Sequence, residues 1–146
     1  MAEIVAVILN TKNGRIWTTN PDTIVYDAIE LMAEKAIGAL PVLVDGRLVG
    51  IISERDYARK IILHGRSSKE THVREIMSAP VTVTPEFTVD ECMRLVTHHR
   101  TRHLPVLDGE KLVGVVSIGD LVNAIIAAQA HTIDQLHTYI TGSYPA

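Results

Sequence analysis

The sequence predicts an α+β fold, built from two tandem β-α-β-β-α repeats that pack sheet to sheet as a pseudo-twofold pair. The first observation is an internal repeat: residues 17–62 align with residues 81–126 at a constant offset of 64, and fifteen of the 46 aligned positions are identical. The second is that strand-like and helix-like apolar patterns follow in the same order in both copies. One such unit is too small to bury its sheet face alone, so we expect the two to pack together.

Each repeat begins with a short extended segment, which ends at Pro21 or at Pro85. A helix should follow, because apolar residues then recur with i, i+3, i+4, i+7 spacing and give the helix one buried stripe. The stripe residues are Val25, Ala28, Ile29, Met32, Ala33 and Ala36 in the first repeat, and Val89, Cys92, Met93 and Val96 in the second. Thr88, with Glu91 three residues later, predicts a capping box at the start of the second helix.

A β-hairpin should follow each helix, because two apolar runs flank an Asp-Gly turn signal. The runs are Leu40–Val44 and Leu48–Ile52 around Asp45-Gly46, and Leu104–Leu107 and Leu112–Val116 around Asp108-Gly109. A final helix is predicted after Ser53 and after Ser117. This arrangement completes the β-α-β-β-α order in both repeats.

The repeats also define the organisation of the chain. We expect an N-terminal segment at 1–16 with a short helix over 2–10, repeat 1 at 17–63, a polar linker at 64–80, repeat 2 at 81–130, and a tail at 131–146. The linker should end in a helical turn over 73–77. The tail should extend the last helix to about Tyr139 and fray past Gly142.

Composition excludes several classes of protein. Hydrophobic residues make up 47% and charged residues 21% of the chain, which argues against disorder. The net charge of −3 gives no reason to expect nucleic acid as a partner, and no apolar run approaches the roughly 18 residues of a membrane span. A single cysteine, Cys92, and an N-terminus without a basic flank favour a cytoplasmic protein.

The pattern Ser-x-x-Asp occurs twice, at Ser53–Asp56 and at Ser117–Asp120, where an apolar strand turns into a helix. A helix N-terminus presents unpaired N–H groups and partial positive charge, so it attracts phosphate. The serine hydroxyl can donate to a phosphate oxygen, and the aspartate can accept two hydrogen bonds from a ribose diol. The alternative is a plain helix cap, and capping and binding can coexist.

The densest basic cluster of the chain comprises His98, His99, Arg100, Arg102 and His103. A metal site is one interpretation, because His99 and His103 are four residues apart, but the repeat alignment places a change from helix to strand between them. A solvated basic patch is another. Cys92 aligns with Ala28 on a helix stripe, so we expect a small buried side chain and not a nucleophile.

The duplicated motifs Leu-Pro-Val-Leu (40–43 and 104–107) and Leu-Val-Gly-x-x-Ser-x-x-Asp (48–56 and 112–120) resemble those of the CBS domain, named for cystathionine beta-synthase, in its tandem form. The likeness covers residues 17–126. It implies a disc-like pair with two clefts between the sheets. Such clefts bind AMP, ADP, ATP, S-adenosylmethionine or NAD(H), and most of these modules regulate a partner by changing shape.

The resemblance also implies which residues bind the nucleotide. Asp56 and Asp120 match the aspartate that holds the ribose, and Arg55 matches an arginine used on phosphate, although it has no twin in the second repeat and a solvated charge is the alternative. Arg102 and His103 precede a strand edge that lines the cleft, so they are candidates for neutralising phosphates. The full set of nucleotide-binding candidates is Thr18, Ala39, Pro41, Ser53, Arg55, Asp56, Thr82, Arg102, His103, Pro105, Ser117 and Asp120. Trp17 could stack on a base, but its twin is Val81, which favours core or edge packing.

Three classes of function remain open from the sequence. The leading hypothesis is a non-catalytic regulatory module that binds an adenine nucleotide, without a catalytic cofactor or metal, and controls an unidentified target protein. A homodimer is expected from the family, with the helices after Ser53 and Ser117 as interface candidates. The second hypothesis is a ligand-independent interaction module, and an S-adenosylmethionine sensor is a variant of the first. An enzyme is the weakest, because the sequence has no P-loop and no Gly-x-Ser-x-Gly.

Overall fold

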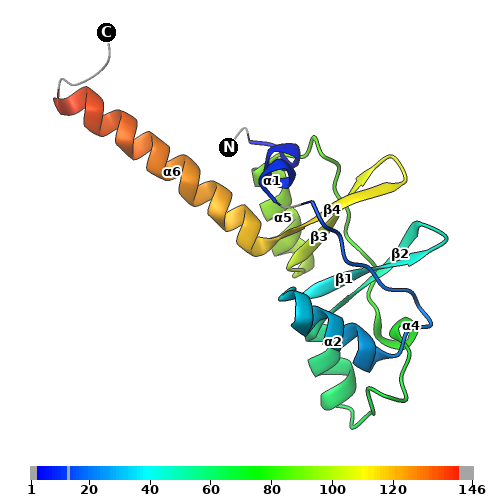
Figure 1. Cartoon of the computed structure of the whole chain (residues 1–146). Coiled ribbons are helices and arrows are strands. Elements are labelled where there is room, and N and C mark those ends of the chain that lie inside the picture. The colour runs from blue at the N-terminus through cyan, green and yellow to red at the C-terminus, as the bar shows by residue number, and fades with distance from the viewer. Residues whose placement is uncertain (1–2, 13, 142–146) are drawn as a thin grey trace.

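The computed structural model describes residues 3–12 and 14–141. The elements run α1 (Val5–Thr11), α2 (Val25–Lys35), β1 (Ala39–Val44), β2 (Arg47–Ser53), α3 (Glu54–Tyr57), the π-helical turn η1 (Ala58–Ile62), α4 (Val73–Ile76), α5 (Val89–His99), β3 (His103–Asp108), β4 (Lys111–Ser117) and α6 (Ile118–Thr141). The strands form two antiparallel hairpins, β1–β2 and β3–β4, and β2 contacts β4. The hairpins therefore meet in the middle, with α2 on one side and α1 and α5 on the other (Figure 1).

Both predicted hairpins form, and each has a glycine with positive φ in its turn. Val44 pairs with Arg47, so the turn between them is Asp45-Gly46, and both residues have positive φ, 50° and 78°. This is the combination that tight hairpins need and that Asp-Gly supplies. In the second hairpin Asp108 pairs with Lys111, so the turn is Gly109-Glu110, one residue later than the sequence suggested.

The extended segments at the start of each repeat are shorter strands than expected. Each pairs with its hairpin through one parallel bridge, Thr19 with Val42 and Val83 with Val106. The β-α-β-β-α order is retained, but the first β element is a single paired residue in both copies.

The predicted helices form, although the buried stripe of α2 is narrower than expected. Val25, Ala28 and Met32 are buried, whereas Ala33 and Ala36 are exposed. The reason for Ala36 is that α2 has already ended: this residue is left-handed, with φ of 55°, and its N–H bonds back to the last turn. Arg100, 64 residues later, ends α5 in the same way with φ of 54°.

The capping box at the start of α5 is confirmed. The Thr88 hydroxyl accepts a hydrogen bond from the Glu91 N–H at 3.1 Å, and the Glu91 carboxylate accepts one from the Thr88 N–H at 3.0 Å. Two backbone N–H groups at this end of the helix are therefore satisfied by side chains.

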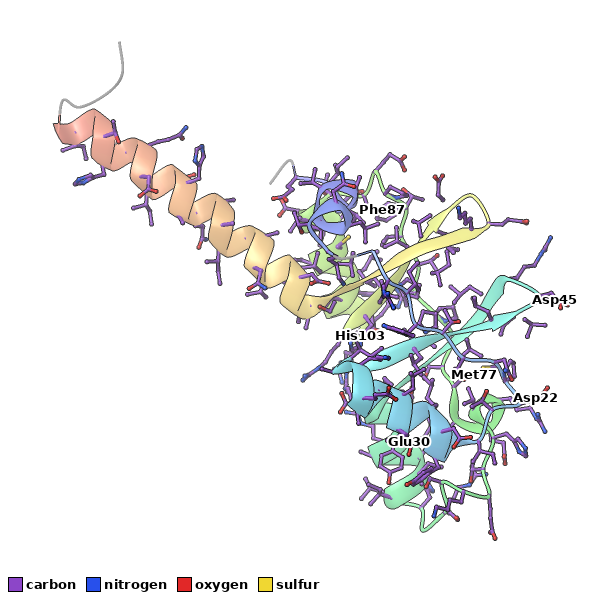
Figure 2. The ribbon with its side chains drawn as sticks, viewed as in Figure 1. Asp22, Glu30, Asp45, Met77, Phe87 and His103 are labelled. Carbon is purple, nitrogen blue, oxygen red and sulfur yellow. The ribbon has the colours of Figure 1, made fainter. Side chains whose placement is uncertain are left out.

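Each repeat has its own hydrophobic core, and each core is completed by a segment outside the repeat. The linker helix α4 completes the first core through Val73 and Ile76. The N-terminal helix α1 completes the second core through Val5 and Ile8, and its backbone bonds to Phe87 (Figure 2). The extra apolar surface thus comes from segments outside the repeats.

The glycines of the two Leu-Val-Gly motifs permit this added packing. A Cβ atom on Gly114 would lie 2.6 Å from a methyl carbon of Leu9, at the end of α1. A Cβ atom on Gly50 would lie 2.7 Å from the sulfur of Met77, just after α4. A side chain at either position would force the end of the Leu9 or Met77 side chain to move, so the two glycines favour this close approach.

The last helix, α6, is 24 residues long and projects away from the body (Figure 1). It extends to Thr141, slightly beyond the predicted end at Tyr139, and the fraying expected past Gly142 concerns residues outside the described ones. Within residues 3–12 and 14–141, no helix combines the length and the apolar character that crossing a membrane requires.

Candidate functional site

Both Ser-x-x-Asp motifs cap the helix that follows them. The Asp56 N–H donates to the Ser53 hydroxyl at 3.2 Å, and the Ser53 N–H donates to the Asp56 carboxylate at 3.0 Å. Ser117 and Asp120 repeat the arrangement at 3.1 and 2.9 Å. The capping role is therefore real in both copies, and any binding role has to be judged from what else surrounds each aspartate.

Protein groups fill the surroundings of Asp56. Its residue is 8% exposed, and its second carboxylate oxygen accepts a hydrogen bond from the Ser78 hydroxyl at 2.9 Å. The ammonium group of Lys60 lies 3.1 Å from the same oxygen. Ser78 is held there because its backbone pairs with Ile51 on β2. A ligand diol that used this carboxylate would have to displace both partners.

The surroundings of Asp120 are more open. Its side chain is 22% exposed, and the ammonium group of Lys12 donates to it at 2.8 Å and also to the Val115 carbonyl at 2.8 Å. Burial alone raises the pKa of this carboxyl, but the hydrogen bonds from Lys12 and Ser117 outweigh it and hold the pKa below its ordinary value of 3.8. Asp120 is therefore ionised at neutral pH and ready to accept hydrogen bonds.

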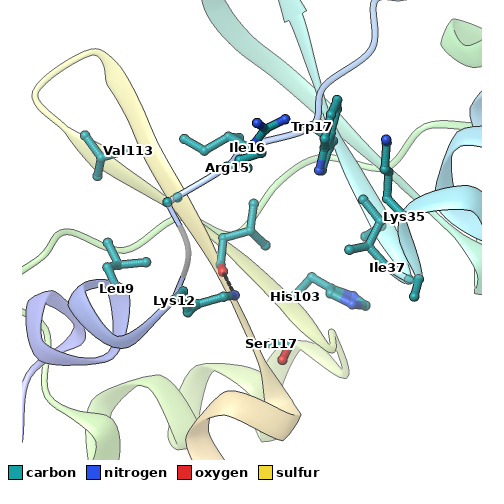
Figure 3. A pocket seen from close by; sticks show the side chains of 16 residues that line it. Leu9, Lys12, Arg15, Ile16, Trp17, Lys35, Ile37, His103, Val113 and Ser117 are labelled. Carbon is teal, nitrogen blue, oxygen red and sulfur yellow. Dashed lines mark hydrogen bonds between the residues drawn. The ribbon is translucent and has the colours of Figure 1, made fainter.

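A cleft of about 570 Å³ opens beside the Ser117–Asp120 corner, and both repeats contribute to it (Figure 3). The N-terminal segment contributes Leu9, Lys12, Gly14, Arg15 and Ile16; repeat 1 contributes Trp17, Lys35, Ala36, Ile37, Gly38 and Ala39; repeat 2 contributes His103, Val113, Gly114, Val115 and Ser117. The volume lies within the range of small-molecule sites. Apolar walls and several cations meet in one space.

Trp17 lies at one end of the cleft, beside two cations. The Lys35 ammonium lies 4.3 Å from the centre of the indole ring, and the Arg15 guanidinium carbon lies 5.9 Å from it (Figure 3). The indole also packs against the first core. The expectation of core or edge packing was thus incomplete, because one side chain both packs on the core and lines the cleft.

His103 lies where the two repeats meet (Figure 2). Its ring is 3.2 Å from the position of a Cβ on Gly38, so a side chain at position 38 would crowd the imidazole. Desolvation and the nearby Arg102 and Lys12 lower the pKa of His103 from 6.5, although Asp120 acts in the opposite direction. The imidazole is therefore neutral at pH 7 in the protein without ligand.

Of the twelve candidates, Ala39, His103 and Ser117 line the cleft, and Asp120 joins them through Lys12. The others lie elsewhere. Arg55 donates to the Arg100 carbonyl at 2.9 Å and so ties repeat 1 to the end of α5. Ser53 and Asp56 form the separate corner described above. The remaining candidates, Thr18, Pro41, Thr82, Arg102 and Pro105, are not part of the cleft wall.

The two prolines have a structural reason for being outside the cleft. Pro41 and Pro105 are buried in β1 and β3, and their carbonyls accept hydrogen bonds from Thr19 and Val83 at 3.0 and 3.1 Å. Thr18 and Thr82 come just before those bridging residues. Arg102 is exposed and contributes its carbonyl to the start of α6.

Sequence reasoning missed most of the cations in the cleft wall. Lys12 and Arg15 precede the repeat alignment, so no twin drew attention to them. Lys35 was noticeable only as the one cation in the stretch that matches the basic cluster of repeat 2. His98 and His99 of that cluster are exposed on α5 and their rings contact each other edge to face.

The fold, the doubled corner and the shared cleft define a tandem CBS module, and comparison with known families agrees: the CBS domain profile matches residues 8–63 and 73–127. The chain belongs to the CBS domain family. It is 46% identical over 135 residues to "CBS domain-containing protein CBSX3, mitochondrial" of Arabidopsis thaliana, covering 88% of this chain and 65% of that protein. The chain therefore spans just under two thirds of the length of this relative.

Solved structures of the same family share the fold. A putative signal-transduction protein with CBS domains from Burkholderia ambifaria is 55% identical, with a TM-score of 0.82, covering 87% of this chain and 96% of that one. The structure of CBSX2 in complex with AMP is 28% identical, with a TM-score of 0.71, covering 86% and 98%. One similar protein has thus been solved with an adenine nucleotide.

Proposed function

We propose that this chain is a non-catalytic regulatory module that binds an adenine nucleotide in the cleft beside Asp120, and that occupancy changes its conformation or association to control a partner protein. The observation that carries the proposal is an ionised, partly exposed carboxylate at the edge of a 570 Å³ cleft shared by both repeats. The AMP complex of CBSX2 supports the ligand class.

The chemistry of the cleft fits the parts of a nucleotide. Asp120 can accept two hydrogen bonds from a ribose diol once Lys12 moves aside. The N-terminus of α6 and the cations Lys12, Arg15 and Lys35 favour phosphate groups. The same cations disfavour the sulfonium of S-adenosylmethionine, so we place AMP, ADP, ATP or NAD(H) ahead of it.

The corner at Ser53 and Asp56 offers the same groups, but Ser78 and Lys60 already occupy the carboxylate. We therefore propose that the Asp120 cleft fills first. A non-catalytic role is supported by Cys92, which is buried and whose thiol pKa is raised to about 11 by burial, too high for a nucleophile at neutral pH. A cytoplasmic location and the identity of the target protein stay predictions.

The test is thermal unfolding of nucleotide-stripped protein with AMP, ADP, ATP, NAD, NADH or S-adenosylmethionine. A ligand at a hundred times its dissociation constant stabilises the fold by about 2.7 kcal/mol, which raises the midpoint by several degrees at roughly 2–4 °C per kcal/mol. Asp120→Asn should abolish the shift, and Asp134→Asn, on the exposed part of α6, should retain it. Asp56→Asn should lower the midpoint of the protein itself and keep the ligand shift.

Two results would decide against this proposal. If none of these ligands moves the midpoint, the ligand-independent interaction module becomes the better interpretation. If a nucleotide stabilises wild type and Asp120→Asn equally, the protein binds nucleotide at another position.

A further inference from the structure

The outer half of α6 carries apolar side chains that do not pack against the body of the molecule. Near its start, Leu121 and Ala124 belong to the second core and Ile125 packs against it. Beyond that point the helix leaves the body, and residues 129–137 are all exposed (Figure 1). A polar surface would be expected there.

Instead, a stripe of apolar side chains runs along the exposed helix. Its members are Val122, Ile126, Gln129, Ile133, Leu136 and Ile140, separated alternately by four and three residues. The five apolar members are 40%, 56%, 63%, 57% and 78% exposed. This alternation is the heptad pattern with which α-helices pair in a coiled coil.

We propose that this stripe, Val122 to Ile140, is the interface between two copies of this chain, whose α6 helices pair in parallel as a short coiled coil. The inference extends the homodimer expected from the family by assigning it to one face of one helix. It does not depend on which ligand the cleft binds, because the outer part of α6 lies away from the cleft wall.

The single polar member of the stripe favours a second copy as the occupant. Gln129 carries both a donor and an acceptor, so two Gln129 side chains can satisfy each other across a twofold axis. This happens only in a parallel pair. In an antiparallel pair of the same stripe Gln129 would face Ile133, and its amide would be left among apolar groups.

Size and charge agree with this occupant. The five apolar residues expose on the order of 500 Å² per chain, so pairing covers about 1,000 Å², the lower limit of a specific interface. The positions that flank the stripe, including Asn123, Ala130 and Thr132, carry no permanent charge. Two identical helices can therefore approach without bringing like charges together.

A lipid surface fits the same helix poorly. Interfacial helices use Lys and Arg on their polar face, and α6 contains neither from Ile118 to Thr141. Its polar face carries Asp134 instead, with His131 on the same side. Anionic headgroups would repel that carboxylate.

The first test is the mass of the full chain in solution, measured by light scattering or sedimentation up to about 100 µM. We expect a dimer for wild type. Ile133→Asp with Leu136→Asp should weaken association about a hundredfold or more, because four charges would enter the interface. The matched control, His131→Asp with Gln135→Asp, adds the same charges on the opposite face and should stay dimeric. Circular dichroism and the ligand-induced thermal shift report whether each variant keeps its fold and its cleft.

The second test fixes the orientation. Leu136→Cys should form an intermolecular disulfide on mild oxidation, whereas His131→Cys should not, and Cys92 is buried and does not compete. A monomeric wild type, or a stripe variant as dimeric as wild type, would overturn the proposal. A dimer without the disulfide at position 136 would overturn the parallel pairing. None of these results bears on nucleotide binding, which the thermal shift measures separately.

Discussion

At the scale of single residues, the two aspartates differ in what a ligand would meet. Their lysine partners are alike: Lys60 and Lys12 are each 41% exposed, and each also donates to a backbone carbonyl. The Asp56 side chain is 11% exposed and also accepts a hydrogen bond from the Ser78 hydroxyl, whereas the Asp120 side chain is 22% exposed. An exposed lysine exchanges an ion pair for water at little free-energy cost, so the burial of Asp56 and its bond to Ser78 make the Asp120 corner the more accessible one.

His103 should make nucleotide binding depend on pH. Its pKa is lowered mainly by burial and by Arg102, so the imidazole is neutral at pH 7, and a nearby phosphate would raise that pKa. Binding then takes up a proton, and the affinity for a phosphate-bearing nucleotide should rise as pH falls from 8 to 6, by at most about tenfold per unit. Calorimetric titration at several pH values measures this slope.

The controls for this prediction are two histidine variants. His103→Gln should bind with a flat pH profile, and His131→Gln, on the exposed helix, should behave as wild type. An unchanged slope in His103→Gln would show that another group takes up the proton. Without ligand the sign for stability is opposite: the unfolded chain accepts a proton on His103 more readily, so stability is lost as pH falls below about 6.5.

At the scale of elements, the capping box of α5 should carry measurable stability. Thr88→Ala removes one cap acceptor and should lower the free energy of unfolding by about 1 kcal/mol. The midpoint should fall by about 2–4 °C, while the ligand-induced shift persists because α5 does not line the cleft. Thr88→Ser keeps the hydroxyl and is the matched control. Equal midpoints for the alanine variant and wild type would mean that water replaces this cap.

The same capping box predicts how the stability difference between wild type and Thr88→Ala changes at low pH. Hydrogen bonds from the backbone and then the hydroxyl of Thr88 lower the pKa of Glu91 below its ordinary value of 4.5. The ionised form is therefore the one that the folded state favours. The stabilisation is present above pH 4.5 and is lost as pH falls through the lowered pKa, so the Thr88→Ala difference should shrink in acid.

Most elements could be predicted from local pattern. The spacing of Val89, Cys92 and Val96 gives the buried face of α5, and Asp45-Gly46 gives the first hairpin turn. The sequence could not show how many residues of the extended segment at the start of each repeat form a strand, because strand pairing depends on which partner strand lies nearby in the fold. Ala36 shows a second limit of prediction from sequence. This apolar residue continues the helical spacing of α2, although its backbone is left-handed and the helix has already ended.

The candidate site was predictable only in part, because its walls come from segments far apart in the chain. The Ser-x-x-Asp corners are local and were located correctly as helix starts. Lys12 and Asp120 are 108 positions apart, and no periodicity links them. Tertiary packing decides how the two corners differ. The linker places Ser78 against the Asp56 corner, and the N-terminal segment, with Gly14, lines the cleft beside the Asp120 corner.

At the scale of the whole molecule, a shared cleft means that one ligand should stabilise both repeats together. Hydrogen exchange with nucleotide bound should slow in 35–39 of repeat 1 and in 113–117 of repeat 2 with the same dependence on ligand concentration. Residues 53–62, around Asp56, are the internal comparison and should change less. Slowing confined to one repeat would contradict a site built by both.

The placement of α1 also has a consequence for synthesis on the ribosome. Val5 and Ile8 belong to a core whose other members begin at Val83, so they are translated long before their neighbours exist. The first repeat can close on α4 as soon as residue 76 has emerged, but the apolar face of α1 must wait for the second. The apolar face of α1 therefore stays without its partners until residues 83–124 have been synthesised, and a chain interrupted before that point leaves this face exposed to chaperones.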